Sequence, residues 1–257
     1  MCPELFKIGP LTVHGYGFMI AIGVLAAYYL SSALAAKAGL NEDMVTWLLG
    51  SIAVGGFLGS KVLNYITLII NGEFSIKELY NFRNGYVVYG GIIGGILASF
   101  LLCRIKKVDV WPYADIIMPT VALAQGFGRI GCFLAGCCYG KETDSVIGVV
   151  FPATAQAPSG VKLFPIQLVF SIVDFAMFAV LFVMLKRKRF KGQIFSLYII
   201  FYAIVRFILE NFRGDAARGQ IGFLSTSQIV SIFIFIAGVT LYILMMHRGN
   251  DKKKKKG

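Results

Sequence analysis

Residues 165–185 read PIQLVFSIVDFAMFAVLFVML, an apolar run that a single charged residue, Asp174, interrupts. A helix of about 20 such residues crosses the roughly 30 Å hydrocarbon layer of a membrane. Backbone polar groups in lipid must be satisfied within the segment, and this run lacks the alternation of a barrel strand. The stretch therefore predicts a transmembrane helix.

Comparable runs recur along nearly the whole chain, so that seven transmembrane helices are predicted. The other six runs are residues 16–36, 45–70, 85–103, 110–125, 193–209 and 226–246. Composition agrees, because 57% of the 257 residues are hydrophobic, only 15% are charged, and the mean hydropathy is +0.74. So little charge cannot coat a soluble particle of this size. We therefore expect an all-α integral membrane protein, which excludes a water-soluble enzyme.

The 25 Lys and Arg residues outnumber the 13 Asp and Glu residues and set the predicted orientation. Most cations lie beside alternate ends of the spans, at residues 37, 104–107, 186–191 and 248–256. The positive-inside rule assigns these clusters to the cytoplasm. We thus expect an external N-terminus, a cytoplasmic C-terminus and outward-facing segments at 71–84, 126–164 and 210–225. Because the clusters flank membrane spans, nucleic acid is not an expected partner.

The expected organisation is a single polytopic membrane domain over residues 1–257. Within it, residues 126–164 are predicted to form a small extracytoplasmic head. Residues 249–257, with the run Lys252 to Lys256, are predicted to be a disordered basic tail near anionic lipid headgroups.

A row of polar residues in the sixth span indicates a binding function. Tyr198, Tyr202, Arg206, Glu210 and Arg213 are spaced by four, four, four and three residues, which puts them on one helix face. A charge at a helix centre costs at least about 2.5 kcal/mol unless it is paired, hydrated or near the interface. Two arginines against one carboxylate leave positive charge for an anion, and guanidinium suits phosphate. The alternative is a self-compensating pair of Arg206 and Glu210.

Arg129, at the predicted outer end of the fourth span, is the second such charge, and glycines around it would allow a lipid headgroup to approach. The alternative is an arginine that reaches to the interface. Three cysteines follow at Cys132, Cys137 and Cys138. No second ligand pair or histidine lies close to them, so we expect no metal and no cofactor. A disulfide, simple packing and a catalytic thiol remain open. Asp115 and Asp174 are further polar candidates within spans.

Several motifs occur in a fixed order along this frame. They are Ile8-Gly9-Pro10, His14-Gly15-Tyr16-Gly17, Tyr89-Gly90-Gly91, GRIGCFLAGCCYG at 128–140, Pro165-x-Gln167-Leu168 and Arg206-x-x-x-Glu210-x-x-Arg213-Gly214-Asp215. In this order the chain resembles the prolipoprotein diacylglyceryl transferases of bacterial inner membranes, and the resemblance covers most of its length.

The resemblance implies a transferase that moves the diacylglyceryl group of phosphatidylglycerol to the lipobox cysteine thiol of a prolipoprotein signal peptide, the first step of lipoprotein maturation. Its site would face the outer side of the cytoplasmic (inner) membrane. The resemblance implies catalytic roles for Arg129, Arg206 and Tyr89. The positions that it implies in substrate binding are Arg129, Tyr16, Gly140, Glu210 and Arg213.

The chain departs from the family pattern where a base is expected. Tyr89 and Phe164 stand where the family often has histidines, Cys132 where it has asparagine and Cys137 where it has glutamate. A tyrosine, with an ordinary pKa near 10, is a poor base at neutral pH. The candidates for the base are a Tyr89 whose hydroxyl is activated by an arginine, a cysteine thiolate, or Glu210. A second hypothesis is a related transferase that uses another acceptor. A third hypothesis is an anion carrier, which the lack of an internal repeat disfavours.

Overall fold

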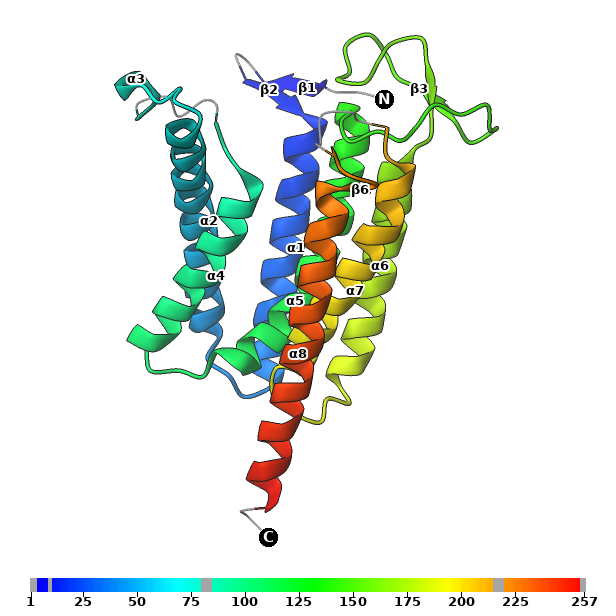
Figure 1. The fold of residues 1–257 in the computed structure, drawn as a ribbon. Coiled ribbons are helices and arrows are strands. Elements are labelled where there is room, and N and C mark those ends of the chain that lie inside the picture. The colour runs from blue at the N-terminus through cyan, green and yellow to red at the C-terminus, as the bar shows by residue number, and fades with distance from the viewer. Residues whose placement is uncertain (1–3, 9–10, 80–84, 215–219, 255–257) are drawn as a thin grey trace. The chain divides into compact units, whose positions relative to one another are not determined.

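The computed structural model describes residues 4–8, 11–79, 85–214 and 220–254 (Figure 1). Over these residues seven helices are long and apolar enough to cross a membrane, which confirms the predicted number. They are α1 (Gly15–Lys37), α2 (Glu42–Ile70), α4 (Val88–Ile105), α5 (Val110–Ala135), α6 (Ile166–Leu185), α7 (Gln193–Leu209) and α8 (Thr226–Lys254).

Short elements occupy the connections between these helices. They are the helix α3 (Ile76–Leu79), the 3-10 turn η1 (Glu210–Phe212), and the antiparallel pairs β1 (Glu4–Ile8) with β2 (Leu11–His14), β3 (Val149–Val150) with β4 (Lys162–Leu163), and β5 (Gln220–Ile221) with β6 (Leu224–Ser225). Gly9, Pro10 and Asp215 of the sequence motifs lie outside the described residues.

The helix α5 is longer than predicted, because it continues from Gln125 to Ala135 and takes in the start of the segment expected as a head. Glycines that look like helix breakers are held in this helix by close packing. A Cβ atom on Gly126 would lie 2.5 Å from the nearest atom of the Phe175 ring, and one on Gly131 would lie 3.2 Å from the carbonyl oxygen of Tyr16. Similarly, α8 continues to Lys254, and residues 255–257 lie outside the described part.

The chain divides into two compact units, residues 1–31 with 114–257, and residues 32–113. In the second unit α2 and α4 run side by side (Figure 1). Their glycines let the two backbones touch, since a Cβ atom on Gly59 would collide with the carbonyl oxygen of Gly90, and one on Gly55 would lie 2.6 Å from that of Gly94. Small residues at this spacing let helix backbones approach closely.

In the first unit, Asp115 of α5 fixes the beginning of α7. Its buried carboxylate accepts hydrogen bonds from the backbone N–H groups of Gly192 (2.9 Å), Ile194 (3.0 Å) and Phe195 (3.1 Å), and pairs with the Lys188 ammonium at 3.3 Å. A carboxylate at a helix N-terminus satisfies donors that lack partners within the helix and complements the helix dipole. Asp115 is therefore a structural anchor of α7.

Candidate active site

The guanidinium group of Arg129 lies between two residues of α6. Its Cζ atom is 4.5 Å from the centroid of the Phe170 ring, and its Nε atom is 4.0 Å from Oδ2 of Asp174. Phe170 and Asp174 are four residues apart and so lie on one face of α6. The Arg129 side chain keeps 21% of its surface exposed. The Arg129 side chain is thus held in place and still accessible to a ligand.

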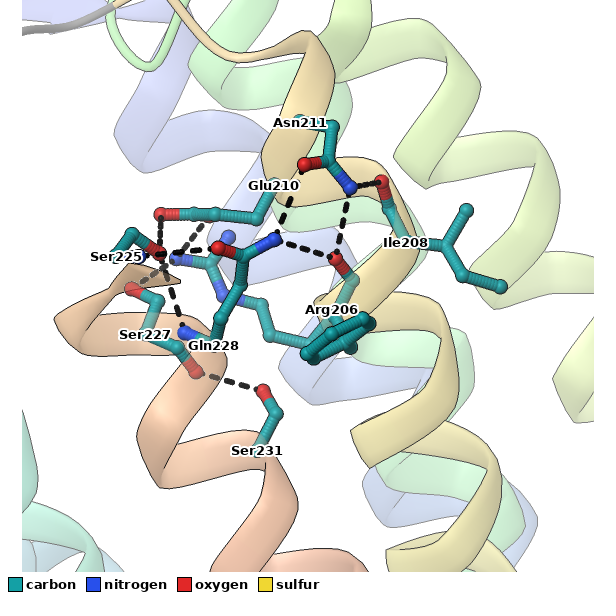
Figure 2. Close-up of polar contacts among 9 residues, drawn as sticks. Arg206, Ile208, Glu210, Asn211, Ser225, Ser227, Gln228 and Ser231 are labelled. Carbon is teal, nitrogen blue, oxygen red and sulfur yellow. Dashed lines mark hydrogen bonds and ion pairs between the residues drawn. The ribbon is translucent and has the colours of Figure 1, made fainter. Parts of the chain in front are cut away.

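Arg206 of α7 reaches the same ring. Its Cζ atom is 5.9 Å from the centroid of Phe170. Its Nη2 atom is 2.9 Å from Oε2 of Glu210 and donates a hydrogen bond to Oγ of Ser227 at 3.0 Å (Figure 2). Its Nη1 atom is buried and has no hydrogen-bond partner among the described residues. Glu210 therefore engages one nitrogen of Arg206 and leaves a buried donor available.

A polar network ties the end of α7 to the start of α8 (Figure 2). The backbone N–H of Ser225 donates to Oε1 of Gln228 at 3.0 Å, and Nε2 of Gln228 donates to Oδ1 of Asn211 at 3.1 Å. The Ser225 hydroxyl donates to Oε1 of Glu210 at 3.4 Å. Through these contacts Glu210, and with it Arg206, is fixed from two helices.

Gly140 and Arg213 form an isolated antiparallel bridge between the loop after α5 and the turn after α7. The Gly140 N–H donates to the carbonyl oxygen of Phe164 at 3.0 Å, and the Gly214 N–H donates to that of Tyr139 at 3.1 Å. Arg213 is buried, and its charge interacts with the charge of Arg206 and with the thiol of Cys138. Three guanidinium groups thus gather near two carboxylates, with positive charge in excess.

The thiols of Cys132, Cys137 and Cys138 lie within 4.8 Å of one another beside these arginines, and they are free. Hydrogen bonds within the cluster raise the pKa of Cys137. They lower the pKa of Cys138, and the charges of Arg213 and Arg129 lower it further. The disulfide that the sequence left open is not formed, and the cluster borders the cationic site.

The two tyrosines that the resemblance singled out lie in different units. Tyr16, near the start of α1, is 44% exposed and interacts electrostatically with the three thiols and Arg129. Tyr89, in the first turn of α4, is 43% exposed and belongs to the unit of residues 32–113. Its catalytic role stays a prediction.

An apolar groove of about 270 Å³ runs between α6 and α7. Its lining residues are Val173, Ala176, Met177, Val180, Phe201, Ile204 and Val205. Val173 and Val205 directly precede Asp174 and Arg206 in the sequence, so one end of the groove lies level with the arginine site. Hydrocarbon chains are the ligands that such a lining suits.

The fold and these contacts define a class, that of multi-pass helical membrane proteins with a cationic site built from several helices. A sequence model of the family described as "Prolipoprotein diacylglyceryl transferase" matches residues 3–244, and the chain belongs to this family.

Relatives from several bacteria carry the corresponding name. A phosphatidylglycerol–prolipoprotein diacylglyceryl transferase of Clostridium tetani (strain Massachusetts / E88) is 45% identical over 94% of this chain and 97% of the relative. An enzyme of that name, numbered 2, from Clostridium perfringens (strain 13 / Type A) is 43% identical over 98% of each. One from Geobacter sulfurreducens is 33% identical over 96% of each.

Proposed function

We propose that this protein transfers the diacylglyceryl group of phosphatidylglycerol to a cysteine thiol of a prolipoprotein signal peptide. The observation that carries the proposal is the pair of guanidinium groups, Arg129 and Arg206, against the single ring of Phe170. With Arg213, three guanidinium groups outnumber the carboxylates of Asp174 and Glu210, and a lipid phosphodiester is an anion that can offset the excess charge. The names of the relatives supply the donor and the acceptor.

In the proposed mechanism the two arginines bind the phosphate and stabilise the charge that develops on the leaving glycerol phosphate. Stabilisation of that kind is often the largest single contribution to catalysis. The buried Nη1 of Arg206, which has no hydrogen-bond partner among the described residues, can donate to the phosphate, and Glu210 keeps the guanidinium group oriented. Arg213 adds positive charge, and its backbone is held by the bridge to Gly140. Tyr16 lies on the side of the site where the three cysteine thiols are. The groove between α6 and α7 suits an acyl chain of the donor.

The proposed location is the bacterial cytoplasmic membrane, with the site toward its outer face. The basic clusters at 104–107, 186–191 and 248–256 lie at the C-terminal ends of α4, α6 and α8. Arg129 and Arg213 lie instead at the C-terminal ends of α5 and α7, the helices that alternate with these along the chain. By the positive-inside rule, those clusters are cytoplasmic and the site is external. A signal peptide that emerges on that side would meet it there.

The test uses the purified full-length chain with phosphatidylglycerol labelled in its diacylglyceryl moiety and a synthetic lipobox peptide. We expect the label to move to the peptide thiol. The Arg129→Ala and Arg206→Ala variants should lose roughly 100- to 1,000-fold in rate. The exposed Arg104→Ala variant is the matched control and should keep the native rate.

Two outcomes would contradict the proposal. The first is no transfer by folded protein while a relative of established activity transfers label in parallel. The second is label that passes only to an acceptor without a cysteine, which would favour a related transferase. Uptake of an anion by proteoliposomes without lipid turnover would favour a carrier instead.

A further inference from the structure

The three free thiols at the turn after α5 have the spacing of metal ligands. Their Sγ atoms all lie within 4.8 Å of one another. Zinc–thiolate bonds of about 2.3 Å place tetrahedral ligand sulfurs about 3.8 Å apart, so closure around an ion requires movements of roughly 1 Å. A disulfide would bring only two sulfurs to about 2 Å and leave the third thiol unused. The spacing therefore fits three ligands of one shared ion.

The local backbone brings these thiols together. Gly136, at φ 70°, ends α5, and its N–H donates to the carbonyl oxygen of Phe133 at 3.2 Å while the N–H of Cys137 donates to that of Cys132 at 3.1 Å. This Schellman motif turns Cys137 back over the last helical turn. Cys138 then adopts φ 57°, a left-handed conformation that costs a non-glycine residue energy and is concentrated at functional sites.

The surroundings suit an ion with an exchangeable ligand. Gln167 donates from Nε2 to the carbonyl oxygen of Cys137 at 2.8 Å, while its Oε1 atom is buried and accepts no hydrogen bond from the described residues. That oxygen can accept from a water on the ion or from an N–H of an incoming peptide. Arg129 and Arg213 interact electrostatically with Cys138, and their charge offsets the net negative charge of three thiolates around a divalent cation.

We propose that Cys132, Cys137 and Cys138 form a binding site for Zn²⁺ with an open fourth position. Three protein ligands and one open position are typical of catalytic zinc, whereas structural zinc has four protein ligands. Cys137 and Cys138 are partly exposed, so the fourth ligand can come from outside the chain. From the sequence we predicted no metal, because no second pair of ligands lies near these cysteines. A zinc site with an open fourth position does not need a second pair.

The fourth ligand is the thiol of the acceptor cysteine, a step that rests on the proposed function. Coordination releases the thiol proton to water and leaves a thiolate on the ion. The sulfur attacks the glyceryl carbon of the donor, the S–C bond forms as the C–O bond breaks, and glycerol phosphate departs with the electron pair beside Arg129 and Arg206. The ion thereby performs the deprotonation for which Tyr89 is a poor base.

The decisive experiment measures metal binding in the absence of lipid and peptide. The full-length chain is purified in detergent under reducing, metal-free conditions, incubated with Zn²⁺ or Co²⁺, and desalted. We expect one ion per chain, and for Co²⁺ the absorption of a tetrahedral, sulfur-ligated centre. C132S, C137S and C138S should each weaken binding at least tenfold. C103S, which alters a buried cysteine of α4, is the matched control and should bind as the native chain does.

Native protein that takes up no ion, or serine variants that all bind like the native chain, would overturn the site. A readout on the native chain guards against variants that misfold: saturating Zn²⁺ should protect the three clustered thiols from alkylation, and full alkylation would refute the site. Ion binding without any lipid transfer would refute the proposed function and leave the site standing. Transfer at an undiminished rate after complete metal removal would refute the acceptor-thiol step alone.

Discussion

Arg129 and Arg206 come from different helices and meet at one aromatic ring. Their Cζ atoms lie 4.5 Å and 5.9 Å from the centroid of Phe170. Two like charges so placed repel each other, and the carboxylates of Asp174 and Glu210 offset that repulsion but leave the charge of the nearby Arg213 in excess. A phosphodiester anion between the arginines would relieve the remainder, which makes the arrangement receptive to a lipid headgroup.

Replacement of the ring tests this relationship. Phe170→Leu keeps an apolar side chain but removes both cation–π contacts, each of which stabilises by about 0.5–2 kcal/mol. We expect the transfer rate to fall about tenfold, with a higher KM for phosphatidylglycerol. Initial rates at varied lipid mole fraction would measure both. Phe182→Leu, three turns along the same helix, is the control. Equal effects of the two substitutions would show that Phe170 contributes packing alone.

Glu210 is predicted to orient Arg206. Glu210→Gln keeps the shape of the side chain but weakens the 2.9 Å ion pair and the hydrogen bond from Ser225. We expect transfer to fall roughly 10- to 100-fold, because Arg206 then samples geometries that do not fit the leaving group. The exposed Glu42→Gln variant at the start of α2 should keep native activity. An unchanged rate in Glu210→Gln would mean that Ser227 and Phe170 suffice to hold the arginine.

Gly140 leaves no room for a side chain. A Cβ atom there would collide with the carbonyl oxygen of Phe164 and lie 3.1 Å from that of Phe212. Gly140→Ala should therefore force the bridge to Arg213 apart, cost about 1–3 kcal/mol and reduce transfer. Thermal unfolding in detergent and the rate assay would measure the two effects. Gly50→Ala in α2, where an added Cβ atom meets nothing within 4 Å, should leave the rate unchanged and should not lower the unfolding temperature.

Asp115 is predicted to matter for stability and not for chemistry. Asp115→Ala would leave three backbone donors at the start of α7 without their acceptor, at a cost on the order of 3 kcal/mol. We expect a lower unfolding temperature but unchanged KM for the fraction that stays folded. Asp115→Asn, which retains one acceptor oxygen, should be intermediate. A selective rise in KM would show that Asp115 has a part in lipid binding.

The helices were predictable because lipid restricts a spanning chain to few conformations. In the part of the chain that the structure describes, the seven predicted runs form seven helices long enough to span a membrane. The end of α5 was not predictable, since Gly126 and Gly131 resemble breakers until Phe175 and Tyr16 are seen to pack against them. The partners of Asp115 also lie far along the chain, so no local pattern indicated an anchor for α7.

The charged part of the site could be identified from the sequence because a charge within an apolar run is itself a signal. Arg129, Arg206 and Glu210 were predicted as site residues in that way, and their roles in the reaction stay predictions. Phe170 was missed, since one more aromatic residue in an apolar helix gives no such signal. The convergence of the thiols depends on a positive φ at Cys138, which linear spacing does not encode.

The pairing of Gly140 with Phe164 also closes the base of a long excursion. The Phe164 N–H donates back to the carbonyl oxygen of Lys141 at 2.9 Å, and the Thr143 N–H donates to that of Lys162 at 3.0 Å. Val146, in the short bend between Thr143 and β3, is 96% exposed. The bend that carries Val146 lies between two hydrogen-bonded parts of this stem, Thr143 and β3, so an insertion there leaves both of them in place. Foreign residues inserted beside Val146, such as an antibody epitope, would therefore be tolerated and would reveal in intact cells which side of the bilayer this end of the protein occupies.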